Sequence, residues 1–365
     1  VRAMKAIRNS SLVTVLITLV SAAASLTANA QTGAAIDSLM RTMQWRQKNN
    51  SECIAADMMM RWQGEEERFR AAFAWTAQNI RYDLAALRDN KLYNHQELVS
   101  NALSKRMALC EGYVAVLDSL CRLMGIETYK VPGYTRWQGK LQPEPHLWIA
   151  VKLGGTWYLS DPTWASGGIV NGRYRADYDT LWFMKPPDKM IRSHMPYDPI
   201  WQLLTQPLTH RGFVNADGST LPGKWQFNDS ITVYLQQAML NQHLAELRRI
   251  RQGFSHQSLQ PRISFLEQSV KVQQHNAVVE LMRQSNALFN AAVGAYNEAV
   301  EAFNSRKPRK QVMASLIRAG QLLESAGAML PKQNVPVSLR DELSLMRRQI
   351  RELEARLREA ESKWY

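Results

Sequence analysis

The sequence predicts an α+β protein in which a helix packs on an antiparallel sheet, followed by an all-α bundle or coiled-coil region. Three observations support this. Apolar residues recur at helical spacing as far as Gly125, and β-branched and aromatic residues then follow an extended pattern. Beyond Ile231 the composition shifts to Gln, Glu, Arg, Leu and Ala with helical periodicity. We therefore expect a mixed domain over residues 31–230 and a helical region over 231–365.

Residues 1–30 have the features of a cleavable signal peptide. An apolar segment, 12–26, ends in Ala28-Asn29-Ala30, a small-x-small cleavage site before Gln31. The preceding positive region carries three basic residues, Arg2, Lys5 and Arg8. An uncleaved anchor is the alternative, but the strongly apolar part is shorter than the about 20 residues that a span needs. We expect a periplasmic or secreted protein with no stable membrane span after cleavage.

The formal charge is strongly positive. It is +13 for the whole chain, and the three basic residues of the leader account for 3 of it, which leaves +10 for the mature protein. Such a charge favours anionic partners, among them cell-envelope polymers or lipid headgroups. No nucleic-acid motif is present, so nucleic acid is not an expected partner, and a solvated basic surface is the alternative meaning of the charge.

Cys110 is the candidate nucleophile. Two helical stretches between Thr32 and Asn101 lead to Ala108-Leu109-Cys110-Glu111-Gly112-Tyr113, which stands just ahead of an apolar helical run. The first turn of a helix has unpaired N–H groups and a partial positive charge, which stabilise a thiolate. A buried structural cysteine would give the same local pattern.

Three cysteines are too few for a disulfide framework in an exported protein. Cys110 and Cys121 are eleven residues apart, which places them roughly 16 Å apart along one helix, too far to bridge. A Cys53–Cys121 pair stays open as an alternative, and in either case Cys110 is the thiol in a reactive setting.

A β-hairpin places a histidine beside an aspartate. The strand-like runs 146–153 and 156–161 flank Gly154-Gly155, a strong two-residue turn signal. In that register Trp148 faces Asp161, and His146 becomes the diagonal neighbour of Asp161, about 7–8 Å away at the backbone. A shift of one residue in the turn would put the two side chains on opposite faces.

Cysteine, histidine and aspartate in this arrangement are what thiol-based acyl transfer requires. The carboxylate orients the ring and stabilises the imidazolium, and the other ring nitrogen takes the thiol proton. Structural readings exist for each residue: His146 as a strand-end histidine and Asp161 as the start of a turn. A zinc site is disfavoured because no closely spaced second ligand pair is present, and no cofactor is expected.

The ordered motifs resemble the transglutaminase-like superfamily, in particular its bacterial branch related to kyphoscoliosis peptidase. They lie within about residues 62–213, and in chain order they are Asn79-Ile80-Arg81-Tyr82-Asp83, Cys110-Glu111-Gly112-Tyr113, Gly133-Tyr134, His146-Leu147-Trp148, Trp157 to Trp164, and His194 to Leu204. The resemblance implies a papain-related α+β fold with Cys110 as nucleophile, His146 as general base and then acid, and Asp161 as the orienting carboxylate. Leu109 and Leu147 depart from the smaller residues usual in the family and would narrow access to the thiol.

Further residues bear on the site. The backbone N–H of Cys110 is a natural oxyanion donor at a helix start, and Tyr82 or Trp75 is a candidate second donor that rests on the resemblance alone. His194 and His210 are expected to be loop histidines rather than metal ligands, because no partner pattern lies nearby.

The C-terminal region is expected to hold three helices. Two are indicated up to Lys307-Pro308 and from Gln311 to Leu330. The last carries a heptad seam of about three and a half repeats: Leu339, Leu343, Met346, Ile350, Leu353, Leu357, Ala360 and Trp364. Such a seam packs either within the chain or against a second copy, so self-association is a possible use of it.

These observations favour an exported cysteine enzyme that acts on a peptide or amide carbonyl of a protein or peptide substrate. Hydrolysis is preferred because nothing in the sequence is dedicated to an amine acceptor. The alternatives are a protein-glutamine transglutaminase and a catalytically idle binding module on the same fold.

Overall fold

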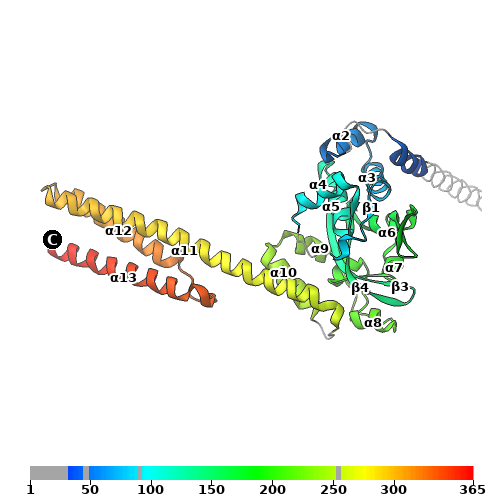
Figure 1. Cartoon of the computed structure of the whole chain (residues 1–365). Helices are drawn as coiled ribbons and strands as arrows, with labels where there is room; N and C mark the ends of the chain where they lie inside the picture. The colour runs from blue at the N-terminus through cyan, green and yellow to red at the C-terminus, as the bar shows by residue number, and fades with distance from the viewer. Residues whose placement is uncertain (1–31, 44–48, 89–92, 252–255, 365) are drawn as a thin grey trace, which may run out of the picture. The chain divides into compact units, whose positions relative to one another are not determined.

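The structure is a computed structural model in which residues 32–43, 49–88, 93–251 and 256–364 are described (Figure 1). The predicted signal peptide therefore lies outside the described residues. None of the helices in the described ranges combines the length and the hydropathy of a membrane span.

The chain divides into two compact units. The first comprises residues up to 236 together with 249–261, and the second comprises 237–248 together with 262 onward. The domain limits expected from the sequence, 31–230 and 231–365, stay predictions.

The N-terminal part of the first unit is helical. Its helices are residues 32–42, α2 (Ser51–Arg61), α3 (Glu65–Asn79), the 3₁₀ turn η1 (Ala86–Arg88), α4 (His95–Lys105) and α5 (Cys110–Leu123). Side chains cap two of them: Asn50 accepts from the Cys53 N–H, and Asn94 forms a capping box with Glu97. On α5 every residue from Gly112 to Leu120 except Ser119 is buried, as expected for a helix surrounded by other elements.

A four-stranded antiparallel sheet follows α5, in the order β5-β4-β3-β8. Its strands are β3 (Glu127–Trp137), β4 (Lys140–Leu153), β5 (Thr156–Ser160) and β8 (His194–Pro196). Gly125, with a φ of 73°, ends the α5 segment and turns the chain into β3. A helix joined to an antiparallel sheet confirms the predicted α+β class.

The sheet is covered on both faces, because alternate residues of β4 belong to different clusters. Ile149, Val151 and Leu153 pack with the apolar residues of α2–α5. Trp148 and Ala150 pack in a second cluster that includes Ile200, Trp201, Leu203 and Ile231 from the segment after β8. The strand that carries His146 is therefore fixed from two sides.

The predicted hairpin register is confirmed. Leu153 pairs with Thr156 and Ile149 with Ser160, so Gly154 and Gly155 are the two turn residues, both with positive φ. Continuing the register by one residue sets Trp148 opposite Asp161.

Two prolines, Pro143 and Pro145, would be expected to interrupt an extended segment, yet β4 runs through both. β5 pairs with β4 only from Ile149 to Leu153, so the earlier part of β4 has β3 alone as a strand neighbour. Pro145 pairs with Tyr134, next to a shift in the β3–β4 register, and Pro143 lies within that shift, where an irregular ladder tolerates a missing N–H.

Smaller elements complete the first unit. They are β1 (Arg81–Tyr82), β2 (Met107–Ala108), α6 (Pro162–Ser166), β6 (Gly167–Val170), β7 (Arg173–Ala176), η2 (Thr180–Trp182), α7 (Pro187–Met190), η3 (Pro199–Gln202), α8 (His210–Asn215) and α9 (Phe227–Gln236). β1 and β2 form a parallel pair, and β6 and β7 form an antiparallel hairpin.

The second unit is built from long helices. They are α10 (Met239–Ile250), α11 (Gln260–Asn304), α12 (Arg309–Met329) and α13 (Arg340–Lys363), with the 3₁₀ turn η5 (Val337–Leu339) just before α13. The 3₁₀ turn η4 (Gln257–Leu259) belongs to the first unit. The heptad seam of α13 belongs to one buried cluster with residues of α11 and α12. Phe303 and Trp364 stack at a ring-centroid distance of 4.4 Å. The seam is thus used within the chain, and self-association through it stays a prediction.

The close approach at Gly133 gives a stability prediction. Gly133 pairs with His146 on one side and Pro196 on the other, and a Cβ there would overlap the Met195 carbonyl oxygen and the Trp148 ring. Gly133→Ala is expected to destabilise the protein by about 1–3 kcal/mol, because the strands must move apart. Urea unfolding measures the change. Gly168→Ala, where a Cβ meets nothing within 4 Å, is the matched control, and equal effects of the two would contradict the prediction.

Candidate active site

Cys110 is the first residue of α5, and its backbone position is set by the β1–β2 pair. Tyr82 of β1 pairs with Ala108 of β2, and the Asp83 N–H donates to the Ala108 carbonyl at 3.0 Å. Leu109 is the extended N-cap of α5 and has no side-chain cap. The thiol therefore lies at a helix start whose first N–H groups are available, as the sequence predicts.

A second contact ties α5 to the same segment. The buried Tyr113 hydroxyl donates to the Ile80 carbonyl at 2.7 Å, one turn after Cys110 and two residues before Tyr82. Gly112 lets this first turn approach Ala108, whose methyl group a Cβ at residue 112 would meet at 2.5 Å. The sequence Cys-Glu-Gly-Tyr thus has a structural reason for its glycine and its tyrosine.

The Asp161 carboxylate is fully buried and accepts four hydrogen bonds. Oδ1 caps α6 by accepting from the N–H groups of Thr163 at 2.8 Å and Trp164 at 3.1 Å. Oδ2 accepts from His146 Nε2 at 2.7 Å and His194 Nε2 at 3.0 Å. Burial opposes ionisation, but His146 and the hydrogen bonds of both histidines hold the pKa of Asp161 well below its usual range. Asp161 thus caps α6 and also binds both histidine rings, and its catalytic role stays a prediction.

His146 lies between Asp161 and Cys110. Since its Nε2 donates to an ionised carboxylate, Nδ1 is the ring nitrogen left for the thiol. Burial alone lowers the pKa of His146, but the charge and hydrogen bond of Asp161, joined by Cys110, outweigh burial and raise that pKa to about 10. The ring also stacks with Trp148, with centroids 6.1 Å apart. The arrangement favours an imidazolium facing the thiol.

His194 was missed as a member of the site. The expectation of a loop histidine is wrong: His194 is buried, opens β8 and shares Asp161 with His146. Burial lowers its pKa to about 4 despite Asp161, so the ring is neutral, and its Nδ1 accepts from the Ser193 hydroxyl at 2.8 Å. The only sequence signal was its place in the downstream motif of the family resemblance.

His210 was also expected in a loop and is instead buried at the start of α8. Its Nδ1 lies 3.0 Å from the Tyr134 hydroxyl, and its Nε2 lies 3.0 Å from the Tyr197 carbonyl oxygen. A carbonyl can only accept, so Nε2 carries the proton and Nδ1 accepts from Tyr134. This histidine joins α8 to the sheet and belongs to the packing of the domain.

The three cysteines differ in accessibility. Cys110 is half-buried, and so are Leu109 and Leu147; that these two leucines narrow access to the thiol stays a prediction. Cys121 is completely buried and is a free thiol, so the Cys53–Cys121 pair is not formed. Burial raises the pKa of Cys121 well above its usual value, which makes that thiol unreactive.

The two aromatic candidates for the second oxyanion donor, Trp75 and Tyr82, have different surroundings. Trp75 is completely buried in the helical cluster, with the Arg106 guanidinium 4.9 Å from its ring. Tyr82 is half-buried, and burial together with the charges of Cys110, Glu144 and Asp161 raises its pKa to about 12. Its hydroxyl therefore stays protonated near Cys110 and is available as a donor.

Three site residues also have the composition of a metal cluster. Ligand atoms of His146, Asp161 and His194 all lie within 4.8 Å of one another. Their separations of 2.7 and 3.0 Å are those of hydrogen bonds, and both Nε2 atoms carry the protons that Asp161 accepts. A metal needs neutral imidazole lone pairs, and the raised pKa of His146 opposes this. The donor set fits a hydrogen-bonded charge network better than a metal site.

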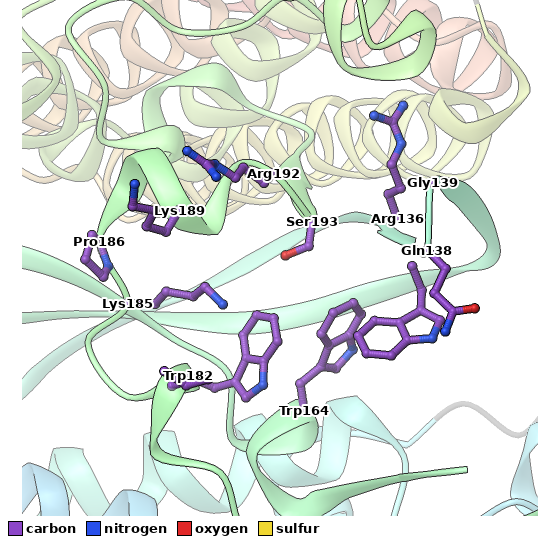
Figure 2. A pocket seen from close by; sticks show the side chains of 12 residues that line it. Arg136, Gln138, Gly139, Trp164, Trp182, Lys185, Pro186, Lys189, Arg192 and Ser193 are labelled. Atoms are coloured by element: carbon purple, nitrogen blue, oxygen red, sulfur yellow. The ribbon is translucent and has the colours of Figure 1, made fainter. Parts of the chain in front are cut away.

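A cavity of about 540 Å³ adjoins this network (Figure 2). Trp164, three residues after Asp161, forms part of its wall and lies 5.9 Å from the His146 ring and 4.4 Å from the His194 ring. Figure 2 shows the Lys185 side chain directed toward the Trp182 ring, with Trp164 beyond it. The cavity is thus separated from the candidate catalytic histidine by one indole.

Comparison with protein families identifies the domain. Residues 53–162 match the model of the transglutaminase-like superfamily, a range that contains Cys110, His146 and Asp161. This part of the chain is a transglutaminase-like domain.

Two curated relatives and one solved structure are similar to parts of the chain. The chain is 30% identical to human kyphoscoliosis peptidase over 178 residues, which cover 46% of this chain and 26% of that protein. It is 27% identical over 124 residues to Hillarin of Drosophila melanogaster, covering 29% of this chain and 15% of that protein. A solved TGase is 17% identical with a TM-score of 0.27, over 37% of each chain. The matches thus span about a quarter or less of the length of the first two relatives.

The opposite pKa shifts predict that His146 titrates far above His194 and His210. With labelled histidine, NMR spectra are expected to show His146 still protonated at pH 8, because Asp161 holds its proton, whereas His194 and His210 are neutral at pH 6. Asp161→Asn keeps an oxygen for the cap of α6 and removes the charge, so it should lower the pKa of His146. A His146 titration near pH 6.5 in the unaltered protein would contradict this assignment.

The same shifts set the pH range of stability. The raised pKa of His146 contributes stability that is complete below pH 6.5 and is lost as pH rises through about 10. The lowered pKa values of His194 and His210 contribute stability that is present above pH 6.5 and is lost as pH falls through about 4. Thermal unfolding followed across pH should show a maximum near neutrality, and stability that still rises between pH 7 and 10 would refute the assignment of His146.

Proposed function

We propose that the protein is an exported cysteine hydrolase that cleaves peptide or amide bonds of a protein or peptide substrate through a thioester acyl-enzyme. One observation carries the proposal. His146 lies between the buried Asp161 carboxylate and Cys110, with a pKa raised to about 10. An imidazolium that is stable at neutral pH favours a thiolate partner, which is the nucleophilic form of cysteine.

In the first half-reaction the Cys110 sulfur attacks the carbonyl carbon, forming a C–S bond. The C–N bond then breaks, and the leaving amine takes the proton of the His146 imidazolium. Charge that develops on the carbonyl oxygen is stabilised by the Cys110 backbone N–H and by the Tyr82 hydroxyl. Asp161 keeps the ring oriented throughout.

In the second half-reaction neutral His146 takes a proton from water. The hydroxide oxygen bonds to the acyl carbon as the C–S bond breaks, which releases a carboxylic acid and restores the thiolate and imidazolium. Hydrolysis is favoured over amine transfer because cations of Lys185 and Arg192 lie in the adjoining cavity, whose described lining includes no acidic residue. A protonated amine acceptor would be repelled there.

The test compares Cys110→Ala with Cys121→Ala. The protein, without its predicted leader, is incubated with a mixed protein substrate and a fluorescent primary amine, and products are read by mass spectrometry. Cleavage by the unaltered protein is expected to fall by about 10⁴-fold or more in Cys110→Ala, because the nucleophile is lost. Cys121→Ala, on the same helix but away from the site, should retain it.

Labelling with iodoacetamide across pH completes the test. Cys110 is expected to alkylate at neutral pH, whereas Cys121 is protected by burial. Incorporation of the amine in place of cleavage would support the transglutaminase alternative instead. An unreactive Cys110 with no product would support the idle binding module.

A further inference from the structure

The cavity beside the site is rich in unpaired positive charge. Four cationic residues line it, and two of them are already engaged: Lys189 pairs with Asp188 at 3.1 Å, and the Arg136 guanidinium donates to the carbonyls of Phe213 and Val214. Lys185 and Arg192 make no ion pair with any carboxylate in the described parts of the chain. None of the described residues that line the cavity is acidic.

Lys185 is the more buried of the two cations that lack an ion pair among the described residues. Its Nζ lies 3.4 Å from the centroid of the Trp182 ring, a cation–π contact that fixes the ammonium group. The residue is half-buried, and burial lowers its pKa, although Asp179 and Asp161 oppose the shift. A partly desolvated ammonium group without a counter-ion gains more from an entering carboxylate than an exposed one does.

Three tryptophans give the cavity an apolar wall. Trp164 meets Trp137 edge-on at 5.6 Å and Trp182 edge-on at 4.8 Å between ring centroids. Trp137 is 53% exposed at the cavity mouth, which is unusual for so large an apolar side chain. Aromatic walls with the held Lys185 ammonium group and the exposed Arg192 side chain suit a substrate side chain that has a short apolar stem and an anionic tip.

We propose that this cavity binds an acidic side chain of the peptide substrate, at a residue close to the scissile bond. Lys185 and Arg192 pair with the carboxylate, and the Trp164 and Trp182 rings cover its methylene stem. This inference rests on the proposed function and names its substrate class. Trp164 connects recognition to catalysis, since the same ring lines the cavity and lies beside His146.

Charge reversal provides the test. Peptides that differ only in Glu, Gln or Lys at each position around the cleaved bond are compared by kcat/KM. The unaltered protein is expected to prefer Glu over Gln by roughly tenfold at one position. In Arg192→Glu the preference should invert toward the Lys peptide, an outcome that general damage to the fold does not produce. Arg175→Gln, an exposed charge on β7 outside the cavity, should keep the preference for Glu.

Binding separates this inference from the proposed function. Tryptophan fluorescence of the Cys110→Ala protein is titrated with the Glu and Gln peptides, a readout that needs no turnover. Tighter binding of the Glu peptide that is lost in Arg192→Glu supports the cavity assignment even if no peptide is cleaved. Cleavage with equal kcat/KM for the Glu and Gln peptides overturns the inference and leaves the hydrolase standing. Binding of phosphatidylglycerol vesicles that depends on Arg192, without any preference among peptides, also overturns it.

Discussion

The buried carboxylate of Asp161 is the group on which the site depends. A charge removed from water is tolerable only when its lone pairs are satisfied, and Asp161 meets this condition with two backbone N–H groups and two imidazole N–H groups. The donors come from three different elements, because Asp161 caps the first turn of α6, β4 carries His146 and β8 carries His194. The cap of α6, the placement of β4 and β8, and the candidate pair of His146 and Cys110 therefore all depend on the same carboxylate.

This dependence explains why two histidines of the same network titrate in opposite directions. Both are buried and both donate to Oδ2, but one negative charge stabilises only one added positive charge well. His146 has the shorter hydrogen bond and also has Cys110 at its other nitrogen, so it holds the proton. His194 has a serine at its other nitrogen and stays neutral. The surrounding tryptophans keep water from weakening that difference.

Local patterns were sufficient for the parts of the site that are close in sequence. The two-residue turn at Gly154 and Gly155 sets the pairing register of β4 and β5. Because the register determines which side chains are neighbours, the proximity of His146 and Asp161 could be predicted by counting residues from the turn. His194 is 33 residues beyond Asp161 and arrives on a three-residue strand, too short for alternation to reveal. The heptad pattern of α13 could be recognised in the sequence, but the pattern did not show that the seam packs against α11 and α12.

The position of β8 at the edge of the sheet determines how much of the chain a complete domain must contain. The family match ends at residue 162, and a fragment cut there would contain Cys110, His146 and Asp161. It would lack the outer strand of the sheet and the second imidazole on Oδ2, so the carboxylate would face solvent or a vacant site on that side. The smallest unit that keeps the Asp161 network complete therefore extends past His194 and through the Ile200–Leu203 packing that supports Trp148. Its boundary is set by the hydrogen bonds of one side chain, beyond the last residue of the proposed triad.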